Sequence, residues 1–172
     1  FDKAKKDKKV PEGKTVIGAP TPSYVGSHVT GFSNMVKAMA AQAEPAEKKN
    51  GKINLIPGWV EPSDMDEIKR LSALVGAKIN MFPDTSGVLD GPLTGKYSMF
   101  PKAGASMDDI KASGGGVGTL ALGEWCSADA ARLLDSKCKV PCSVIDMPFG
   151  LKATDRFIDA LRTIAGTSVP DE

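Results

Sequence analysis

Residues 53–82 read INLIPGWVEPSDMDEIKRLSALVGAKINMF, and this stretch decides the fold. It begins with an apolar run at 53–56 and ends with a second apolar run at 77–82. Between the two runs, Ser63 and Asp66 resemble a capping box, which marks the start of a helix. A strand, a helix and a second strand in this order predict a right-handed βαβ unit with parallel strands.

The same alternation continues toward the C-terminus. Two more apolar runs, at 117–122 and 140–145, predict further strands. A short helix is expected to begin at Ser106, a longer one to be capped by Ser127, and the last to be opened by Thr154. The alternation predicts an α/β fold, with a parallel sheet of about four to five strands and helices on both faces, in the Rossmann-like manner.

The chain divides into three segments before any motif is considered. Residues 1–20 are interpreted as a basic arm and lead-in, in which residues 14–19 form a strand or an extended segment. Residues 21–50 are expected to hold a loop and a first helix capped by Ser33. Residues 51–172 are expected to form a βαβ domain of four strand–helix units.

Composition restricts the function classes. The 172 residues suit one domain, and 22 basic against 21 acidic residues give a net charge of +1, so no nucleic acid or membrane partner is indicated. No apolar run approaches the ~20 residues that span a bilayer. Three cysteines are too few for a disulfide framework, which favours a cytoplasmic protein. A chain that starts at Phe1 is expected to be a fragment.

Several motifs that suggest chemistry have simpler explanations. Cys138 and Cys142 could pair or bind a metal, but no second cysteine pair or histidine cluster accompanies them, so reduced thiols are expected. The glycine run at 114–116 precedes a strand, whereas a dinucleotide loop follows one, so it is interpreted as a flexible connector. The acidic residues at 64–67 fall in a first helical turn, where they favour capping over catalysis.

Two tryptophans follow predicted strands. Trp59 and Trp125 each lie just beyond the end of an apolar run. Ligands of parallel α/β folds bind beyond the carboxyl ends of the strands. Both residues are therefore expected to line a cleft or a subunit contact, and the sequence does not separate these alternatives.

Residues 21–32, TPSYVGSHVTGF, are dense in turn residues, small hydroxyls and glycine, and they hold the only histidine. We expect this loop to present chemistry at a buried contact. A serine nucleophile at Ser27 would need glycine two positions before and after it, but Val25 and Val29 stand there. His28 is therefore expected to be a buried imidazole bonded to loop carbonyls, and a hydrolase using Ser27 is the weakest function considered.

A longer segment, TPSYVGSHVTGFSNM at 21–35, closely resembles the β subunit of nitrogenase component 1. The resemblance extends to KINLIPGWVEPSDMDEIKRL at 52–71, to MFPDTSGVLDGPLTGKYSMFPKAG at 81–104 and to MPFGLKATDRFI at 147–158. It implies the middle of three α/β domains, of nitrogenase-domain type, with the molybdenum–iron form favoured. The vanadium–iron and iron-only forms, and a scaffold protein for cofactor assembly, are the alternatives.

The resemblance also implies partners and cofactors. The β subunit would join a nitrogenase α subunit in an α₂β₂ heterotetramer, which a separate ATP-hydrolysing iron protein reduces. An [8Fe-7S] P-cluster at the α–β interface would pass electrons to the iron–molybdenum cofactor of the α subunit, where dinitrogen is reduced to ammonia.

Ser27 matches the serine beside the P-cluster, whose oxygen ligates an iron when the cluster is oxidised, and Gly26 would let the backbone approach the cluster. The resemblance thus makes 21–50 the cluster-facing loop and first helix. It places the cysteines that hold the P-cluster upstream of the matched residues. Because a lone serine cannot hold such a cluster, the isolated chain is expected to bind none and to be inactive.

Overall fold

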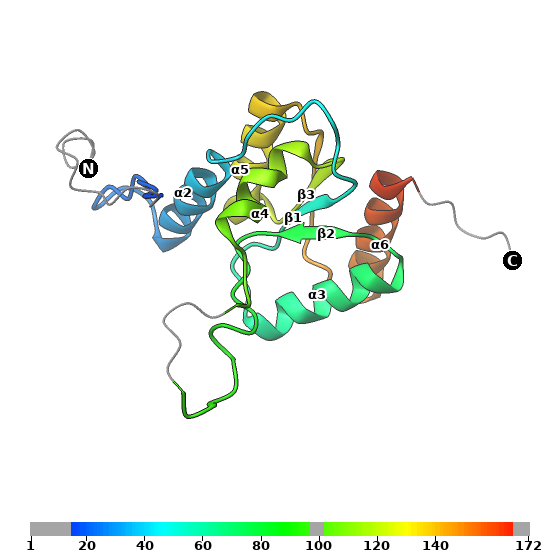
Figure 1. Ribbon diagram of the computed structural model, residues 1–172, viewed down its shortest axis with the longest axis horizontal. Helices are drawn as coiled ribbons and strands as arrows, with labels where there is room; N and C mark the ends of the chain where they lie inside the picture. The colour runs from blue at the N-terminus through cyan, green and yellow to red at the C-terminus, as the bar shows by residue number, and fades with distance from the viewer. Residues whose placement is uncertain (1–14, 97–101, 167–172) are drawn as a thin grey trace, which may run out of the picture.

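A computed structural model describes residues 15–96 and 102–166. Four parallel strands form one sheet in the order β2–β1–β3–β4 (Figure 1). The strands are β1 (Ile53–Ile56), β2 (Ile79–Met81), β3 (Gly118–Leu122) and β4 (Cys142–Ile145). The parallel α/β fold expected from the sequence is confirmed, although the last three strands begin one or two residues later than their apolar runs.

Helices cover both faces of this sheet, as Figure 1 shows. On one face lie α2 (His28–Ala40), α4 (Met107–Ala112) and α5 (Glu124–Cys138), and on the other lie α3 (Pro62–Leu74) and α6 (Leu151–Ala165). The central strands β1 and β3 are buried at every position, as expected for strands covered on both sides.

Alternating side chains of the central strands divide the core in two. The α5-side core contains Val36, Ala40, Ala43, Ile56, Phe82, Ile110, Ala121, Ala130, Ala131, Leu134, Cys138 and Val140. The α6-side core contains Ile53, Leu55, Met65, Ile68, Ala77, Met81, Leu120, Leu122, Phe157 and Leu161. Successive residues such as Leu55 and Ile56 enter opposite cores because side chains alternate across a strand.

Four helices begin earlier than predicted. The residues that cap them are Ser27 in place of Ser33, Glu61 in place of Ser63, Gly123 in place of Ser127, and Gly150 in place of Thr154. The prediction was correct for α4, where Ser106 accepts a hydrogen bond from the Asp109 backbone N–H at 3.1 Å.

Two of the misassigned hydroxyls bind the preceding strand or turn. The Ser127 hydroxyl donates to the Leu122 carbonyl at 3.0 Å, and the Thr154 hydroxyl donates to the Pro148 carbonyl at 3.1 Å. Both residues lie in the first turn of a helix that starts at a glycine with positive φ. Their role is therefore to fasten the helix start to the segment before it.

The glycine run is a tightly packed turn, and its interpretation as a flexible connector was wrong. Ser113–Gly115 form a buried 3-10 helix between α4 and β3. A Cβ atom on Gly114 would overlap the Glu44 carbonyl oxygen, and one on Gly116 would lie 2.6 Å from the Asn54 side-chain nitrogen. The Asn54 amide in turn donates to the Ser113 carbonyl at 2.7 Å, which ties this turn to β1.

The chain before α2 forms no strand in residues 15–19, and Lys14 lies outside the described residues together with most of the predicted basic arm. Residues 15–20 are largely exposed and pair with neither edge strand, β2 or β4. The Asn34 amide donates to the Pro20 carbonyl at 2.9 Å and ties this lead-in to α2. Within the described part of the chain, no helix is long and apolar enough to cross a membrane.

Candidate functional site

The strand order creates a topological switch point between β1 and β3. From β1 the chain runs through α3 to β2 on one side, and from β3 it runs through α5 to β4 on the other. The segments that leave the carboxyl ends of β1 and β3 thus diverge and leave a crevice, where ligands of such folds bind.

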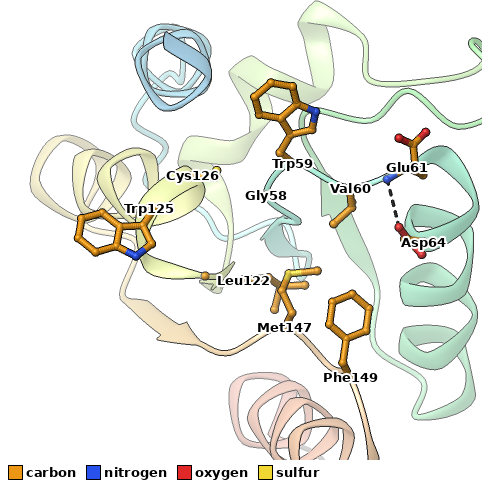
Figure 2. Close-up of a pocket in the computed structure, with 11 residues that line it drawn as sticks. Gly58, Trp59, Val60, Glu61, Asp64, Leu122, Trp125, Cys126, Met147 and Phe149 are labelled. Carbon is orange, nitrogen blue, oxygen red and sulfur yellow. Dashed lines mark hydrogen bonds between the residues drawn. The ribbon is translucent and has the colours of Figure 1, made fainter. Parts of the chain in front are cut away.

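A pocket of about 360 Å³ occupies this crevice, and we call it the switch-point pocket (Figure 2). It is lined by Gly58, Trp59, Val60, Glu61, Asp64, Leu122, Gly123, Trp125, Cys126, Met147 and Phe149. In Figure 2, Trp59, Trp125 and Phe149 surround Leu122 and Met147 at the strand ends.

Glycine lets the turn after β1 approach β3. Gly58 has φ +80, a conformation that side chains disfavour. A Cβ atom there would lie 3.1 Å from the Leu122 carbonyl oxygen and 3.4 Å from the Ser127 hydroxyl. The Pro57-Gly58-Trp59 turn is therefore held close to the end of β3.

The aromatic residues of the switch-point pocket remain largely in contact with solvent. Trp125 is 81% exposed, Phe149 is 68% exposed and Trp59 is 53% exposed. Exposed apolar residues that cluster in this way mark interaction surfaces. The sequence predicted that the two tryptophans line either a cleft or a subunit contact. They do line a cleft, and the subunit contact stays a prediction.

A second pocket of about 800 Å³, which we call the Ser27 groove, lies beside the first. It is lined by Gly26, Ser27, Val29, Thr30, Ser33, Asn34, Glu124, Trp125, Cys126 and Asp129. The two pockets share Trp125 and Cys126. The structure thus places Gly26 and Ser27, the two site residues expected from the sequence, at the carboxyl edge of the sheet.

Ser27 is the N-cap of α2, and its geometry depends on the glycine before it. Gly26 has φ +73, and a Cβ atom there would lie 2.9 Å from the Thr30 Cβ. Ser27 and Thr30 form a capping box, in which the Ser27 backbone N–H donates to the Thr30 hydroxyl at 3.3 Å. Any larger residue at position 26 would displace Thr30 and disturb this cap.

The start of α2 favours negative charge near Ser27. A helix N-terminus carries a partial positive charge, and α2 has no acidic residue in its first turn to neutralise it. Ser27 is exposed, so its hydroxyl can reach a group outside this chain. Tyr24, three residues earlier, has φ +63, a strained conformation of a kind that gathers at binding and active sites.

The prediction that His28 is a buried imidazole was wrong, because the first residue of α2 projects beyond the core. His28 is exposed, and its ring meets the Trp59 ring edge-on at a centroid distance of 5.2 Å and an interplanar angle of 85°. Phe32, one turn later, stacks on the same Trp59 ring at 5.1 Å and 11°. His28 therefore contacts an aromatic ring, and among the described residues it makes no hydrogen bond with the Ser27 hydroxyl.

The acidic residues of the Ser27 groove are engaged with cations. Arg132 contacts Glu124 at 2.6 Å and Asp129 at 3.8 Å, and Lys37 lies 3.6 Å from Asp129. The hydrogen bond with Glu124 raises the pKa of Arg132. Within residues 15–96 and 102–166, no group of three or more His, Cys, Asp or Glu side chains is arranged to hold a metal ion.

The three cysteines are free thiols. Cys138 ends α5 and Cys142 begins β4, at the amino edge of the sheet away from the Ser27 groove. Burial raises the pKa of both thiols, and Asp135 raises that of Cys142 further, which disfavours the thiolate that a metal site requires. Cys126, which we did not expect at the site, lines both pockets, and its place just after the end of β3 is the signal that could have found it.

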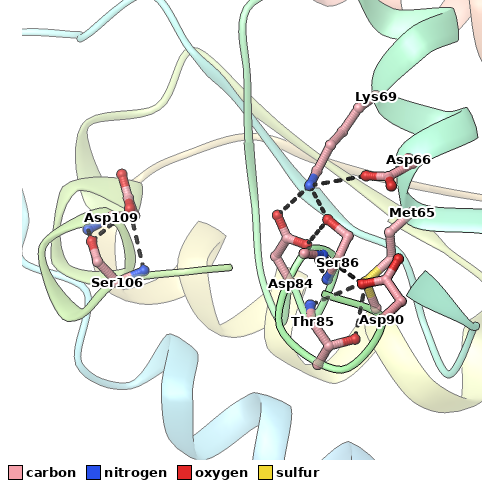
Figure 3. A network of polar contacts seen from close by, with 10 residues as sticks. Met65, Asp66, Lys69, Asp84, Thr85, Ser86, Asp90, Ser106 and Asp109 are labelled. Atoms are coloured by element: carbon pink, nitrogen blue, oxygen red, sulfur yellow. Dashed lines mark hydrogen bonds and ion pairs between the residues drawn. The ribbon is translucent and has the colours of Figure 1, made fainter. Parts of the chain in front are cut away.

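The acidic residues at the start of α3 act structurally, as expected. Asp64 accepts the Glu61 backbone N–H at 3.1 Å, and Glu67 pairs with Arg70 at 2.7 Å. Figure 3 shows how the segment after β2 is attached to α3: the Lys69 ammonium lies 2.7 Å from Asp84 and also contacts Ser86. These contacts hold the segment after β2 against α3 and pair the Asp84 carboxylate with a cation.

Comparison with known proteins identifies close relatives. The model of the family described as nitrogenase component 1 type oxidoreductase matches residues 2–172. The nitrogenase molybdenum-iron protein beta chain of Clostridium pasteurianum is 52% identical over 162 residues, which cover 94% of this chain and 35% of the relative. The vanadium-iron protein beta chain of Trichormus variabilis is 31% identical, over 91% of this chain and 34% of the relative. The iron-iron protein beta chain of Rhodobacter capsulatus is 33% identical, over 87% of this chain and 32% of the relative.

A solved structure agrees with this result. The structure titled "Nitrogenase Cp1 at pH 6.5" superposes with a TM-score of 0.93 at 50% sequence identity, covering 98% of this chain and 37% of that chain. The chain therefore spans about a third of the length of the curated relatives that it matches.

Proposed function

Because this chain belongs to the family of nitrogenase component 1 type oxidoreductases, we propose that it forms the middle α/β domain of a nitrogenase β subunit. In the assembled enzyme it would meet the α subunit of an α₂β₂ heterotetramer and contribute to the environment of the P-cluster. The whole enzyme, reduced by its iron protein, would convert dinitrogen to ammonia.

One observation supports this role above the others: Ser27 stands exposed at the N-cap of α2, on the wall of an open groove. A serine oxygen is a hard donor, which suits oxidised iron better than reduced iron. Ligation requires the loss of the hydroxyl proton, and the positive end of α2 lowers the cost of the resulting negative charge. Ser27 therefore has the properties of a ligand that binds in one redox state.

This chain would supply only part of the ligand set of the cluster. An iron–sulfur cluster is held by cysteine thiolates, and Cys126 is the only cysteine on the groove wall in the described part of the chain. The other ligands would come from the rest of the β subunit and from the α subunit. The residues present fit a single oxygen ligand at the edge of the [8Fe-7S] P-cluster, which would relay electrons to the iron–molybdenum cofactor. Because Gly26 has no side chain, the backbone before Ser27 could come close to the cluster.

We propose the molybdenum–iron form on the strength of a single relative, since other molybdenum-iron β chains are 32–34% identical to this chain, as are the other two metal forms to within a few per cent. Identity is 52% to a molybdenum-iron β chain but 31% and 33% to a vanadium-iron and an iron-iron β chain. Each of these relatives is named as a β chain of an enzyme, which favours a nitrogenase subunit over an assembly scaffold.

The test replaces Ser27 in the assembled heterotetramer. Ser27→Ala and Ser27→Gly both remove the hydroxyl, and glycine is the milder replacement at an N-cap because it costs only a few tenths of a kcal/mol. Both variants are expected to keep the wild-type iron content, because thiolates hold the cluster. Both should alter the electron paramagnetic resonance spectrum of the oxidised cluster and weaken the pH dependence of its potential.

Ser63→Ala, which removes an exposed serine from α3, is the control and should leave the spectrum unchanged. If Ser27→Gly has the oxidised-state spectrum and pH dependence of the wild type, Ser27 is only a helix cap and the proposed role is wrong.

A further inference from the structure

The two ends of α2 are fixed by different means. Its C-terminal half is anchored in the α5-side core, where Val36 and Ala40 are fully buried. Its first turn is less buried: Ser27, His28 and Thr30 are exposed and Val29 is half-buried. Ser27 itself therefore makes no contact within that core, which secures the helix from Phe32 onward.

An aromatic contact holds the first turn instead. The Trp59 ring stacks on Phe32 at 5.1 Å and receives the edge of His28 at 5.2 Å. His28 and Phe32 are four residues apart on one helix, so they lie on the same face. The single Trp59 ring thus covers one side of the turn that begins at Ser27.

Trp59 is anchored to the central strands of the sheet. It directly follows Pro57 and Gly58, which are buried at the end of the central strand β1. The close approach of Gly58 to the Leu122 carbonyl fixes this turn against β3 as well. The contact therefore connects the start of α2 to the centre of the sheet.

From these contacts we infer that Trp59 is a positioning residue for Ser27: it holds the N-cap of α2 in the place from which the Ser27 hydroxyl reaches the cluster. This role rests on the proposed function of Ser27. Helix ends fray readily, and a small displacement of a reacting group lowers its effectiveness strongly. Removal of the Trp59 ring should release the first turn while leaving the buried half of α2 in place.

The test compares variants in the assembled heterotetramer. Trp59→Leu removes the stacked ring and Trp59→Phe keeps a ring that can stack. Phe149→Leu removes a more exposed ring of the switch-point pocket. Phe149 is not among the aromatic partners of α2 in the described residues. Two readouts are recorded: the spectrum of the oxidised cluster, and hydrogen exchange of the Thr30 and Gly31 amides, which donate to the Ser27 carbonyl at 3.0 and 3.3 Å.

For Trp59→Leu we expect exchange at Thr30 and Gly31 to be about tenfold faster, as these amides lose the protection of a fixed N-cap. We also expect part of the oxidised cluster to show the spectrum of Ser27→Gly. Trp59→Phe should restore both properties, and Phe149→Leu should leave both unchanged. A purely structural role for Trp59 would change exchange alone.

The outcomes separate the two proposals. If Ser27→Gly alters the oxidised spectrum but Trp59→Leu does not, the positioning role is wrong and the role of Ser27 stands. If Ser27→Gly itself has the wild-type spectrum, the proposed role of Ser27 is wrong, and the positioning role of Trp59 is wrong with it. Should Trp59→Leu fail to assemble, His28→Ala removes the edge-on contact with the same ring from an exposed residue and should change both readouts in the same direction by a smaller amount.

Discussion

Gly114 lies where the turn between α4 and β3 passes the Glu44 backbone. Because a Cβ atom would overlap the Glu44 carbonyl oxygen, Gly114→Ala must push two backbone segments apart. Overpacking of this kind costs about 1–3 kcal/mol, and we expect at least this loss in the free energy of unfolding, measured by urea denaturation.

Gly31→Ala is the matched control for that prediction. Gly31 lies inside α2, and the nearest atom to an added Cβ is a methyl carbon of Thr21 at 3.9 Å. Alanine is the better helix former, so this variant should gain about 0.5–1 kcal/mol. Equal stabilities of the two variants would contradict the packing role of Gly114.

The site residues differ in how far the sequence could predict them. Gly26 and Ser27 are proposed as site residues from the resemblance of the loop, whereas composition and spacing indicated only an unusual loop. The contact of Trp59 with His28 and Phe32 could not be predicted, because it depends on where α2 crosses the carboxyl edge of the sheet. No local pattern encodes that crossing, and for the same reason the exposure of His28 was missed.

At the scale of elements, α4 carries a capping box with a measurable consequence. The Ser106 hydroxyl donates to the Asp109 carboxylate at 2.6 Å, and the Ser106 backbone N–H donates to it at 3.3 Å. The hydroxyl hydrogen bond from Ser106 is the largest of the effects that hold the pKa of Asp109 below its ordinary value. Ser106→Ala is therefore expected to raise the pKa of Asp109, as measured by nuclear magnetic resonance of its carboxyl carbon.

The sign of the effect on stability follows from this lowered pKa. The stabilisation by ionised Asp109 is fully present above its unfolded pKa of about 3.9 and is lost as the pH falls through the lower folded value. The stability difference between wild type and Ser106→Ala should thus shrink in that acid range. Ser136→Ala on α5 is the control, and an unchanged Asp109 titration in Ser106→Ala would rule out the assigned cause.

Elements were predicted well where a local pattern determines them. The run at 53–56 became β1, and Ser106 capped α4, because both depend on adjacent residues. The caps of α5 and α6 were misplaced, since Ser127 and Thr154 donate to the carbonyl oxygens of Leu122 and Pro148. A hydroxyl near a helix start can bind either the helix or the preceding segment, and the three-dimensional turn decides between them.

At the scale of the whole molecule, the two cores share one sheet. Leu134 lies fully buried in the α5-side core and Leu161 fully buried in the α6-side core. Leu134→Ala and Leu161→Ala should each lower the free energy of unfolding by about 2–5 kcal/mol. Because neither core persists without the sheet, circular dichroism and tryptophan fluorescence should give the same midpoint for each variant.

Leu74→Ala provides the control, since Leu74 is 69% exposed at the end of α3 and should change stability by no more than about 0.5 kcal/mol. Two separate transitions in either core variant would show that the faces unfold independently.

The pairing of β1 with β3 also sets the order in which the molecule can fold. Asn54 and Thr119 are paired across the centre of the sheet although 65 positions separate them, whereas Asn54 and its partner Asn80 in β2 are 26 positions apart. Closing a longer loop costs more entropy, and distant contacts form later. During synthesis β1, α3 and β2 leave the ribosome before β3 does, so one edge of β1 stays unpaired until β3 has been made. The crevice between β1 and β3 is consequently among the last parts of the domain to take shape, so a nascent chain cannot present its site before the sheet is complete.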